Sequence, residues 1–196
     1  MTDKEAAVLS RLSVAGIAIL LFAVAFPLTE AKGVEALIEG LRIERESETI
    51  VVSFSVTNCF NKKMEEAIKT GIPTTFNFFV NLYKKRAIIW DKKIASHKFR
   101  HRIIYDNLKQ DFRIWLQEKG KEIRVQDLEE AKRSMQLVEG FPVAKRQELD
   151  KGIYELAAKA ELDPVKLPLR LEGILFFVSL WNFETDWCYR TMRVEQ

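Results

Sequence analysis

The sequence predicts a mainly β domain, a β-rich α+β fold of the antiparallel sandwich type with one to three short helices, preceded by an N-terminal signal or anchor helix. Several segments alternate apolar and polar residues with a period of two, which is the pattern of half-buried strands. The few helical segments do not alternate with the strands, which argues against a parallel α/β sheet. Residues 32–196 are long enough to form a single domain with its own core, and we expect one β-rich periplasmic domain there.

Residues 1–31 are expected to be a signal peptide or an N-terminal membrane anchor. Residues 12–28 carry no charge, follow a polar stretch that contains Lys4 and Arg11, and precede a small-x-small triplet that ends at Ala31. This order of basic, apolar and small residues is that of a secretory signal. The apolar run is slightly shorter than the ~20 residues of a membrane span, so both cleavage and retention stay open. The basic residues favour a cytoplasmic N-terminus, which places the rest of the chain in the periplasm.

The first half of the domain predicts a hairpin, a helix and two long strands. In the last of these strands, alternate residues are apolar or histidine, and the others are polar and must face solvent. Gly71 and Pro73 end the helix, because glycine favours the C-terminal cap and proline cannot continue a helix. The expected elements are strands at 41–45 and 50–57, a helix at 61–70, and strands at 74–83 and 95–105.

The second half predicts a further hairpin, a capped helix and two more strands. Asp127 with Glu130 forms a capping box at the start of the helix, and Gly140 is expected to end it. A polar helical stretch is expected after Pro142. The expected elements are strands at 112–116 and 122–125, a helix at 128–138, and strands at 154–162 and 187–194; the apolar residues 169–180 fit either helix or strand.

No residues with the pattern of a catalytic or metal site emerge from the sequence, and no cofactor is expected. His97 and His101 would lie ~13 Å apart on a strand, too far to share a metal ion, so we interpret them as partly buried or rim histidines. Asp91, Asp106 and Asp111 fit caps or turns better than an acid–base pair. Cys59 has no histidine near it in sequence, and phosphate-binding or nucleophile-elbow motifs are absent from the sequence.

Two groups of side chains are candidates for an interaction surface. The basic group is either a set of solvated turns and strand faces or a contact for anionic lipid headgroups. The aromatic group either closes one end of the core or forms a patch for a partner protein. The candidate surface residues are Lys84, Lys85, Arg86, Lys92, Lys93, Trp181 and Trp187; Lys98, Arg100 and Arg102 extend the basic group, and Phe176, Phe177 and Phe183 extend the aromatic one.

The net charge of +3 is too small to predict a nucleic-acid partner. Cys59 and Cys188 are the two cysteines. They would form a disulfide in an oxidising compartment if their Cα atoms came within ~7 Å, and otherwise they are separate core thiols.

Several short segments together resemble an uncharacterised bacterial family, domain-of-unknown-function family 4390. The segments are Asn58 and Phe60, Glu66-Ala67, residues 71–76, residues 82–86, Trp90-Asp91, residues 105–108, residues 181–183, and Thr185-Asp186-Trp187. The resemblance implies an exported protein of about this size, with no assigned activity and frequent encoding beside a sensor histidine kinase. It supplies no catalytic or binding residues, and the two cysteines are not part of the family pattern.

We therefore expect a non-catalytic binding or interaction module of the envelope. Its partner would be an inner-membrane protein such as a sensor kinase, or the anionic membrane surface. A carrier that holds an apolar or acyl ligand between phenylalanine-rich faces is the alternative, and an unrecognised hydrolase is the second alternative. A large apolar pocket would favour the carrier, and a pocket with convergent titratable groups would favour the enzyme.

The first prediction is export. A C-terminal alkaline phosphatase fusion should be active, because residues 12–28 should direct the chain across the inner membrane and the phosphatase folds only in the oxidising periplasm. A fusion that lacks residues 12–28 is the control and should be inactive. An inactive full-length fusion with the protein found in the cytosol would contradict the prediction.

Overall fold

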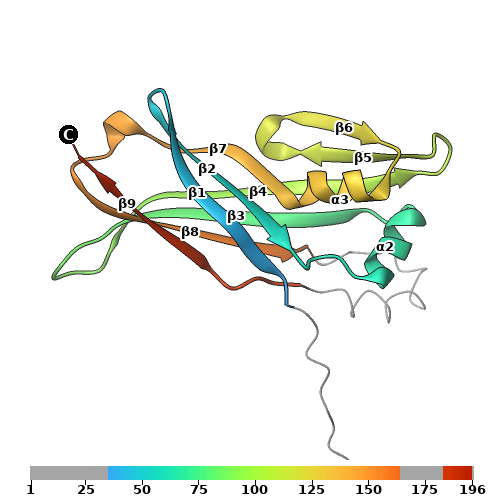
Figure 1. Ribbon diagram of the computed structural model, residues 1–196, viewed down its shortest axis with the longest axis horizontal. Helices are drawn as coiled ribbons and strands as arrows, with labels where there is room; N and C mark the ends of the chain where they lie inside the picture. Colours follow the sequence, from blue (N-terminus) through green and yellow to red (C-terminus); the bar gives the residue numbers. More distant parts are fainter. Residues whose placement is uncertain (1–34, 164–182, 196) are drawn as a thin grey trace, which may run out of the picture. The chain divides into compact units, whose positions relative to one another are not determined.

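The computed structural model describes residues 35–163 and 183–195, all within one compact unit that spans residues 34–196. The expected signal or anchor segment, the apolar residues 169–180 and Trp181 lie outside the described residues. Among the described residues, no helix has the length and apolar character needed to span a membrane. Figure 1 shows these elements: β1 (Leu37–Glu46), β2 (Thr49–Thr57), α2 (Lys62–Lys69), β3 (Thr74–Lys84), β4 (Lys92–Asp106), β5 (Asp111–Leu116), η1 (Gln117–Lys119), β6 (Lys121–Val125), α3 (Leu128–Gln136), β7 (Leu137–Lys145), η2 (Arg146–Glu148), β8 (Gly152–Leu162) and β9 (Cys188–Val194).

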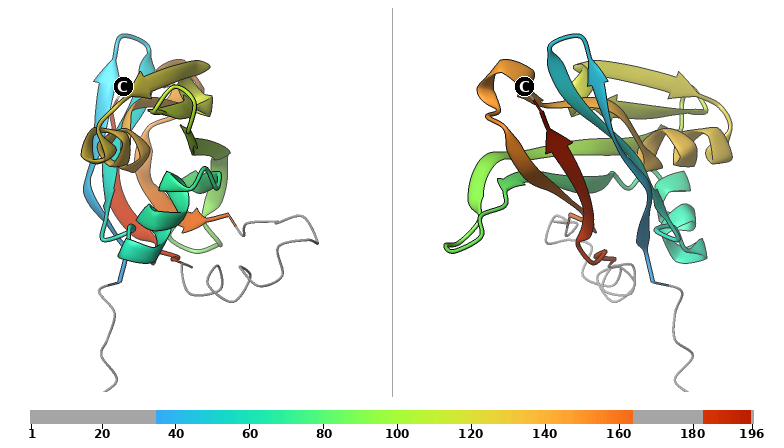
Figure 2. Two further views of the ribbon diagram at one scale, coloured as in Figure 1. Left: turned by 90° about the vertical axis from the view of Figure 1, so that its right-hand side faces the viewer. Right: turned by 60° about the vertical axis from the view of Figure 1, so that its left-hand side comes forward.

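The strands form two antiparallel sheets, which confirms the predicted β-rich fold. The smaller sheet has the order β1-β2-β7, and the larger one has the order β6-β5-β4-β3-β8-β9. Strand β3 is central in the larger sheet and pairs along its length with both β4 and β8. The further views in Figure 2 show the β1–β2 ribbon (blue) crossing the strands of the larger sheet.

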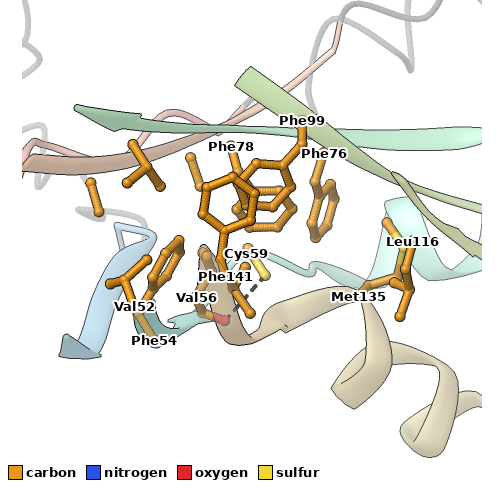
Figure 3. Close-up of a cluster of buried hydrophobic side chains, with 14 of the residues drawn as sticks. Val52, Phe54, Val56, Cys59, Phe76, Phe78, Phe99, Leu116, Met135 and Phe141 are labelled. Carbon is orange, nitrogen blue, oxygen red and sulfur yellow. Dashed lines mark hydrogen bonds between the residues drawn. The ribbon is translucent and has the colours of Figure 1, made fainter. Parts of the chain in front are cut away.

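Phenylalanine rings from both sheets fill the space between them (Figure 3). The rings of Phe78 and Phe99 stack at 5.3 Å, and the ring of Phe99 stacks at 4.3 Å on Phe141 from the opposite sheet. Phe54 of β2 completes the contact, with its ring 6.1 Å from that of Phe78. These rings come from alternate positions of their strands, so the period-two pattern accounts for the core directly.

Both predicted helices are present, and the second begins at its predicted cap, Asp127. The side chain of Asn61 accepts a hydrogen bond from the Met64 amide at 2.9 Å, and that of Asp127 accepts one from the Glu130 amide at 2.8 Å. Gly71 follows α2 with a φ of +87°, a left-handed conformation that glycine adopts without strain. The predicted caps at Asp127 and Gly71 are therefore confirmed, and Asn61 is an additional N-terminal cap.

The end of α3 and the segment after it were predicted wrongly. The helix ends at Gln136, and residues 137–145 form strand β7, which was not expected. The polar helical stretch expected after Pro142 is present only as the short 3-10 helix η2 at Arg146–Glu148. Gly140 does not end the helix but lies in β7 with a φ of +62°, where the pairing with β2 shifts register. Pro142 is compatible with a strand here because β7 is the edge of its sheet.

A buried histidine–glutamate pair joins β4 to the β5–β6 turn and to α3. Nε2 of His101 lies 3.1 Å from a carboxylate oxygen of Glu118, and Nδ1 lies 3.0 Å from the carbonyl oxygen of Met135. The side chains of His101 and Glu118 are 0% and 2% exposed. A carbonyl oxygen can only accept, so Nδ1 carries a proton and donates it to Met135. Burial opposes the ionisation of Glu118, but the hydrogen bond and charge of His101 outweigh it and hold the pKa of Glu118 below its ordinary value.

The second prediction concerns this pair. Replacing Glu118 by Ala should lower the free energy of unfolding by about 3 kcal/mol or more, because a buried partner would be left unpaired. Glu118→Gln should cost less, since its amide can donate to a neutral Nε2. Urea unfolding at neutral pH measures both, with Glu122→Ala as the control because the Glu122 side chain is 40% exposed.

The lowered pKa of Glu118 also predicts a pH dependence. Its contribution to stability is complete above the ordinary carboxyl pKa and is lost as the pH falls through the lowered folded-state pKa. Below about pH 5, the wild type should therefore lose stability more steeply than Glu118→Gln. Equal slopes, or an unchanged urea midpoint for Glu118→Ala, would contradict the structural role of the pair.

Candidate functional site

The loop between β3 and β4 exposes three large apolar side chains in succession. The exposed fractions are 94% for Ile88, 60% for Ile89 and 95% for Trp90. We call these three residues the hairpin tip; Figure 1 shows their loop (green) projecting beyond the neighbouring strands. Soluble domains rarely expose adjacent large apolar side chains, and such a patch usually marks a site of contact with a protein or a membrane.

A carboxylate at the base of the loop holds the hairpin tip in place. Asp91 lies 2.7 Å from Nζ of Lys85 and accepts a hydrogen bond at 3.1 Å from the backbone amide of Arg86. The bond from Lys85 and the bond from Arg86 together hold the pKa of Asp91 below its ordinary value. Because Lys85 and Arg86 precede the tip and Asp91 follows it, these contacts close the loop and display the tip.

The basic residues that the sequence singled out surround this loop. We call Lys84, Lys85, Arg86, Lys92 and Lys93 the basic collar. Lys84 pairs with Asp150 at 3.1 Å, and Lys85 also reaches Glu155 at 3.4 Å. Within the described residues, the side chains of the other three enter no ion pair. The structure therefore brings the predicted basic group together on both sides of the tip.

Other residues at this end of the larger sheet extend the same surface. The amide of Lys85 donates a hydrogen bond at 2.9 Å to the carbonyl oxygen of Ile153, which is 42% exposed. Ile153 lies opposite the exposed Arg193 on β9, and Lys151 is exposed beside it. Apolar and cationic side chains are therefore adjacent over the ends of β3, β4, β8 and β9.

The predicted aromatic residue Trp187 lies elsewhere on the larger sheet. Its ring is 36% exposed and lies 5.7 Å from Nζ of Lys159, which also pairs with Glu184. Lys159 is opposite Phe79, five residues along β3 from Lys84, or roughly 17 Å. The structure thus separates Trp187 from the basic collar.

The remaining aromatic candidates are divided between the core and the undescribed part of the chain. Phe183 is buried, and its ring packs edge-on against Phe76 at 4.8 Å. Of the two roles considered for the aromatic group, Phe183 therefore has the one of closing an end of the core. Trp181, Phe176 and Phe177 lie outside the described residues.

The titratable residues considered for chemistry have structural roles in the described fold. Nε2 of His97 lies 2.8 Å from the carbonyl oxygen of Val143 and so links the two sheets. The side chain of Asp106 accepts hydrogen bonds from the amides of Leu108 and Lys109 in a turn. Asp111 lies 3.6 Å from Arg124. The expectation of a partly buried or rim position holds for His97 but is wrong for His101, which is completely buried.

The two cysteines are free thiols, so the disulfide considered between them is not formed. Sγ of Cys59 lies 3.6 Å from the carbonyl oxygen of Val56 inside the core (Figure 3). Burial raises the pKa of the Cys59 thiol to about 11, so it stays protonated and unreactive at neutral pH. Cys188 is half-buried at the start of β9, opposite Ala158.

Sequence reasoning missed the hairpin tip itself, although a signal for it was present. Ile88, Ile89 and Trp90 fall between two strands whose period-two patterns were recognised, and basic residues flank them on both sides. Large apolar residues in a turn have no core to enter. That position could have marked them as exposed.

The comparisons with known proteins give a family and no activity. The family described as Domain of unknown function (DUF4390) matches residues 34–190. Searches of curated proteins and of solved structures found no match to the chain. The matched range covers nearly all of the two described segments. The chain therefore belongs to domain-of-unknown-function family 4390.

Proposed function

We propose that the domain is a non-catalytic interaction module of the bacterial cell envelope and that it docks through the hairpin tip. The observation that carries the proposal is the display of Ile88, Ile89 and Trp90 on a closed loop among cations. Binding sites concentrate their energy in a few large side chains that lose contact with water, and Trp is the most frequent of these. In the unbound domain, the tip has the exposure that such anchors need.

The core supports an interaction module over a carrier. A carrier would hold its apolar ligand between the two sheets, where Phe54, Phe78, Phe99 and Phe141 are in ring-to-ring contact. An apolar ligand would have to displace these rings, at the cost of the packing that stabilises the fold.

The contacts of the titratable groups support an interaction module over a hydrolase. A catalytic base must be free to reach a substrate proton. His101 is enclosed by Glu118 and Met135, and His97 is committed to the carbonyl oxygen of Val143. Asp91 is committed to the base of the loop.

The proposed place of action is the periplasmic face of the inner membrane. It depends on the export predicted from residues 12–28. The resemblance of the sequence to a family often encoded beside a sensor histidine kinase makes such a membrane protein the first partner to test. Trp187, on the larger sheet away from the tip, would then be available to the same partner.

The third prediction tests the docking role of the tip in cells. A photo-crosslinking amino acid at Ile88 of the full chain should give crosslinks to an inner-membrane protein or to phospholipid. The same amino acid at Leu108 is the matched control, because Leu108 is 97% exposed at the tip of another turn. Trp90→Ser should reduce the crosslinks from position 88 about tenfold, since the largest anchor is lost.

Identical crosslinking from positions 88 and 108, or crosslinking from 88 that Trp90→Ser leaves unchanged, would overturn the proposed role. Thermal unfolding of the variants should match the wild type, because the replaced side chains contribute nothing to the core. This comparison separates loss of docking from loss of folding.

A further inference from the structure

We infer that the partner of the hairpin tip is the surface of an anionic phospholipid bilayer. Ile88, Ile89 and Trp90 enter the boundary between headgroups and acyl chains, and the basic collar contacts lipid phosphates. The inference rests on the proposed docking role of the tip and specifies the chemical nature of the partner.

The apolar side chains fit a membrane interface in kind and in position. Trp is enriched at this depth of a bilayer because its ring is apolar and its indole N–H stays hydrogen-bonded to polar groups. Two isoleucines beside it add apolar surface that only the acyl region can bury. All three are exposed and lie beyond the last strand pair, Lys84 with Lys92, so they can enter the bilayer without unfolding the strands behind them.

The charges fit an anionic surface. The cations lie on the end of β3, the start of β4 and the adjoining ends of β8 and β9, behind the tip and on both sides of it. In that position they reach headgroup phosphates when the tip is inserted. The cations at this end are Lys84, Lys85, Arg86, Lys92, Lys93, Lys151 and Arg193, and the acids are Asp91, Asp150, Glu155 and Glu195.

Three of the four acids oppose this contact little, because each is paired, and only the exposed Glu195 enters no ion pair within the described residues. Asp91 and Glu155 share Lys85, and Asp150 pairs with Lys84. Among the cations that lack an ion pair in the described structure, Arg86 and Lys92 are two residues from the tip in sequence and Lys93 is three. The excess positive charge is therefore concentrated where the bilayer surface would lie.

The convex form of the site favours a bilayer over a protein partner. A stable protein interface covers about 800 Å² on each partner. One Trp buries at most about 250 Å², so three side chains on a projecting loop fall short of that area without a wide surface around them. A bilayer accepts a narrow apolar projection and needs only cations around it.

The test uses the full chain in nanodiscs and measures the depth of the tip. The chain carries Cys188→Ser, since Cys188 is half exposed, whereas Cys59 is buried with a raised pKa and stays unlabelled. An environment-sensitive fluorophore is attached through Ile88→Cys, or through Leu108→Cys as the matched control. The nanodiscs contain phospholipid with brominated acyl chains. One set contains only neutral phospholipid, and the other contains about one third phosphatidylglycerol, whose negative charge attracts the cations of the collar.

We expect bromine quenching at position 88 in the anionic nanodiscs and little at position 108. Lys92→Gln and Lys93→Gln should each shift the equilibrium away from the docked state about fivefold, and Trp90→Ser about tenfold. High salt should weaken docking in the same direction as the lysine variants, because it screens the cations. Lys119→Gln, in the β5–β6 turn, should have no effect.

Equal quenching at positions 88 and 108, or quenching at 88 that is the same in neutral nanodiscs and insensitive to Lys92→Gln, would overturn the inference. Absence of quenching at 88 in every nanodisc would also overturn it. In that case, protein crosslinks from position 88 in cells would leave the proposed docking role standing with a protein partner, whereas the absence of any crosslink would remove both.

Discussion

The buried pair of His101 and Glu118 is the constraint on which the rest of the structure depends. Two ionisable side chains are stable in an apolar interior only when close hydrogen bonds offset the loss of water. Both ring nitrogens of His101 are satisfied, by Glu118 in the β5–β6 turn and by the carbonyl oxygen of Met135 at the end of α3, whereas Oε1 of Glu118 has no hydrogen-bond partner among the described residues. A slip of β4 by one residue would move His101 to solvent and an arginine into the core. The pair therefore selects the register of β4 against β3 and β5, and with it the side chains that face outward.

The register of β4 in turn determines how the hairpin tip is presented. Pairing runs from Thr74 opposite Ile103 to Leu82 opposite Ala95, and then shifts by one residue so that Tyr83 lies opposite Lys93. The extra residue, Ile94, forms a bulge near the start of β4, close to the loop end of the hairpin. Bulges increase the local twist of a hairpin and redirect the residues beyond them. The buried pair thus fixes the register of the strands, and the bulge changes the direction of the end of the β3–β4 hairpin. The contacts of Asp91 then close the loop on which the tip is displayed.

Most of the fold could be predicted from the sequence because its determinants are local. Period-two alternation places the strands, and side-chain caps such as Asn61 and Asp127 place the helix starts. Strand β7 could not be predicted in this way, since Gly140 and Pro142 are tolerated only because of a bulge and an edge position that the rest of the sheet creates. The partner of His101 could not be predicted either, because Glu118 comes close to it only when β4 and β5 have paired. The basic collar was identified from sequence, but its relation to an exposed apolar tip required the hairpin geometry.

The electrostatics at the base of the loop keep the hairpin tip displayed near neutral pH, so the docking that we propose is not a pH switch. The pKa of Asp91 is below its ordinary value, so its contacts with Lys85 and Arg86 are fully formed above the ordinary carboxyl pKa and are lost only as the pH falls through the lowered one. Neutral and mildly acidic surroundings lie above both values. The matching interaction raises the pKa of Lys85, so this lysine stays charged over the same range. The loop is therefore closed whenever the domain is folded near neutral pH, and the proposed docking would depend on the density of anionic groups at the surface and on the ionic strength that screens them.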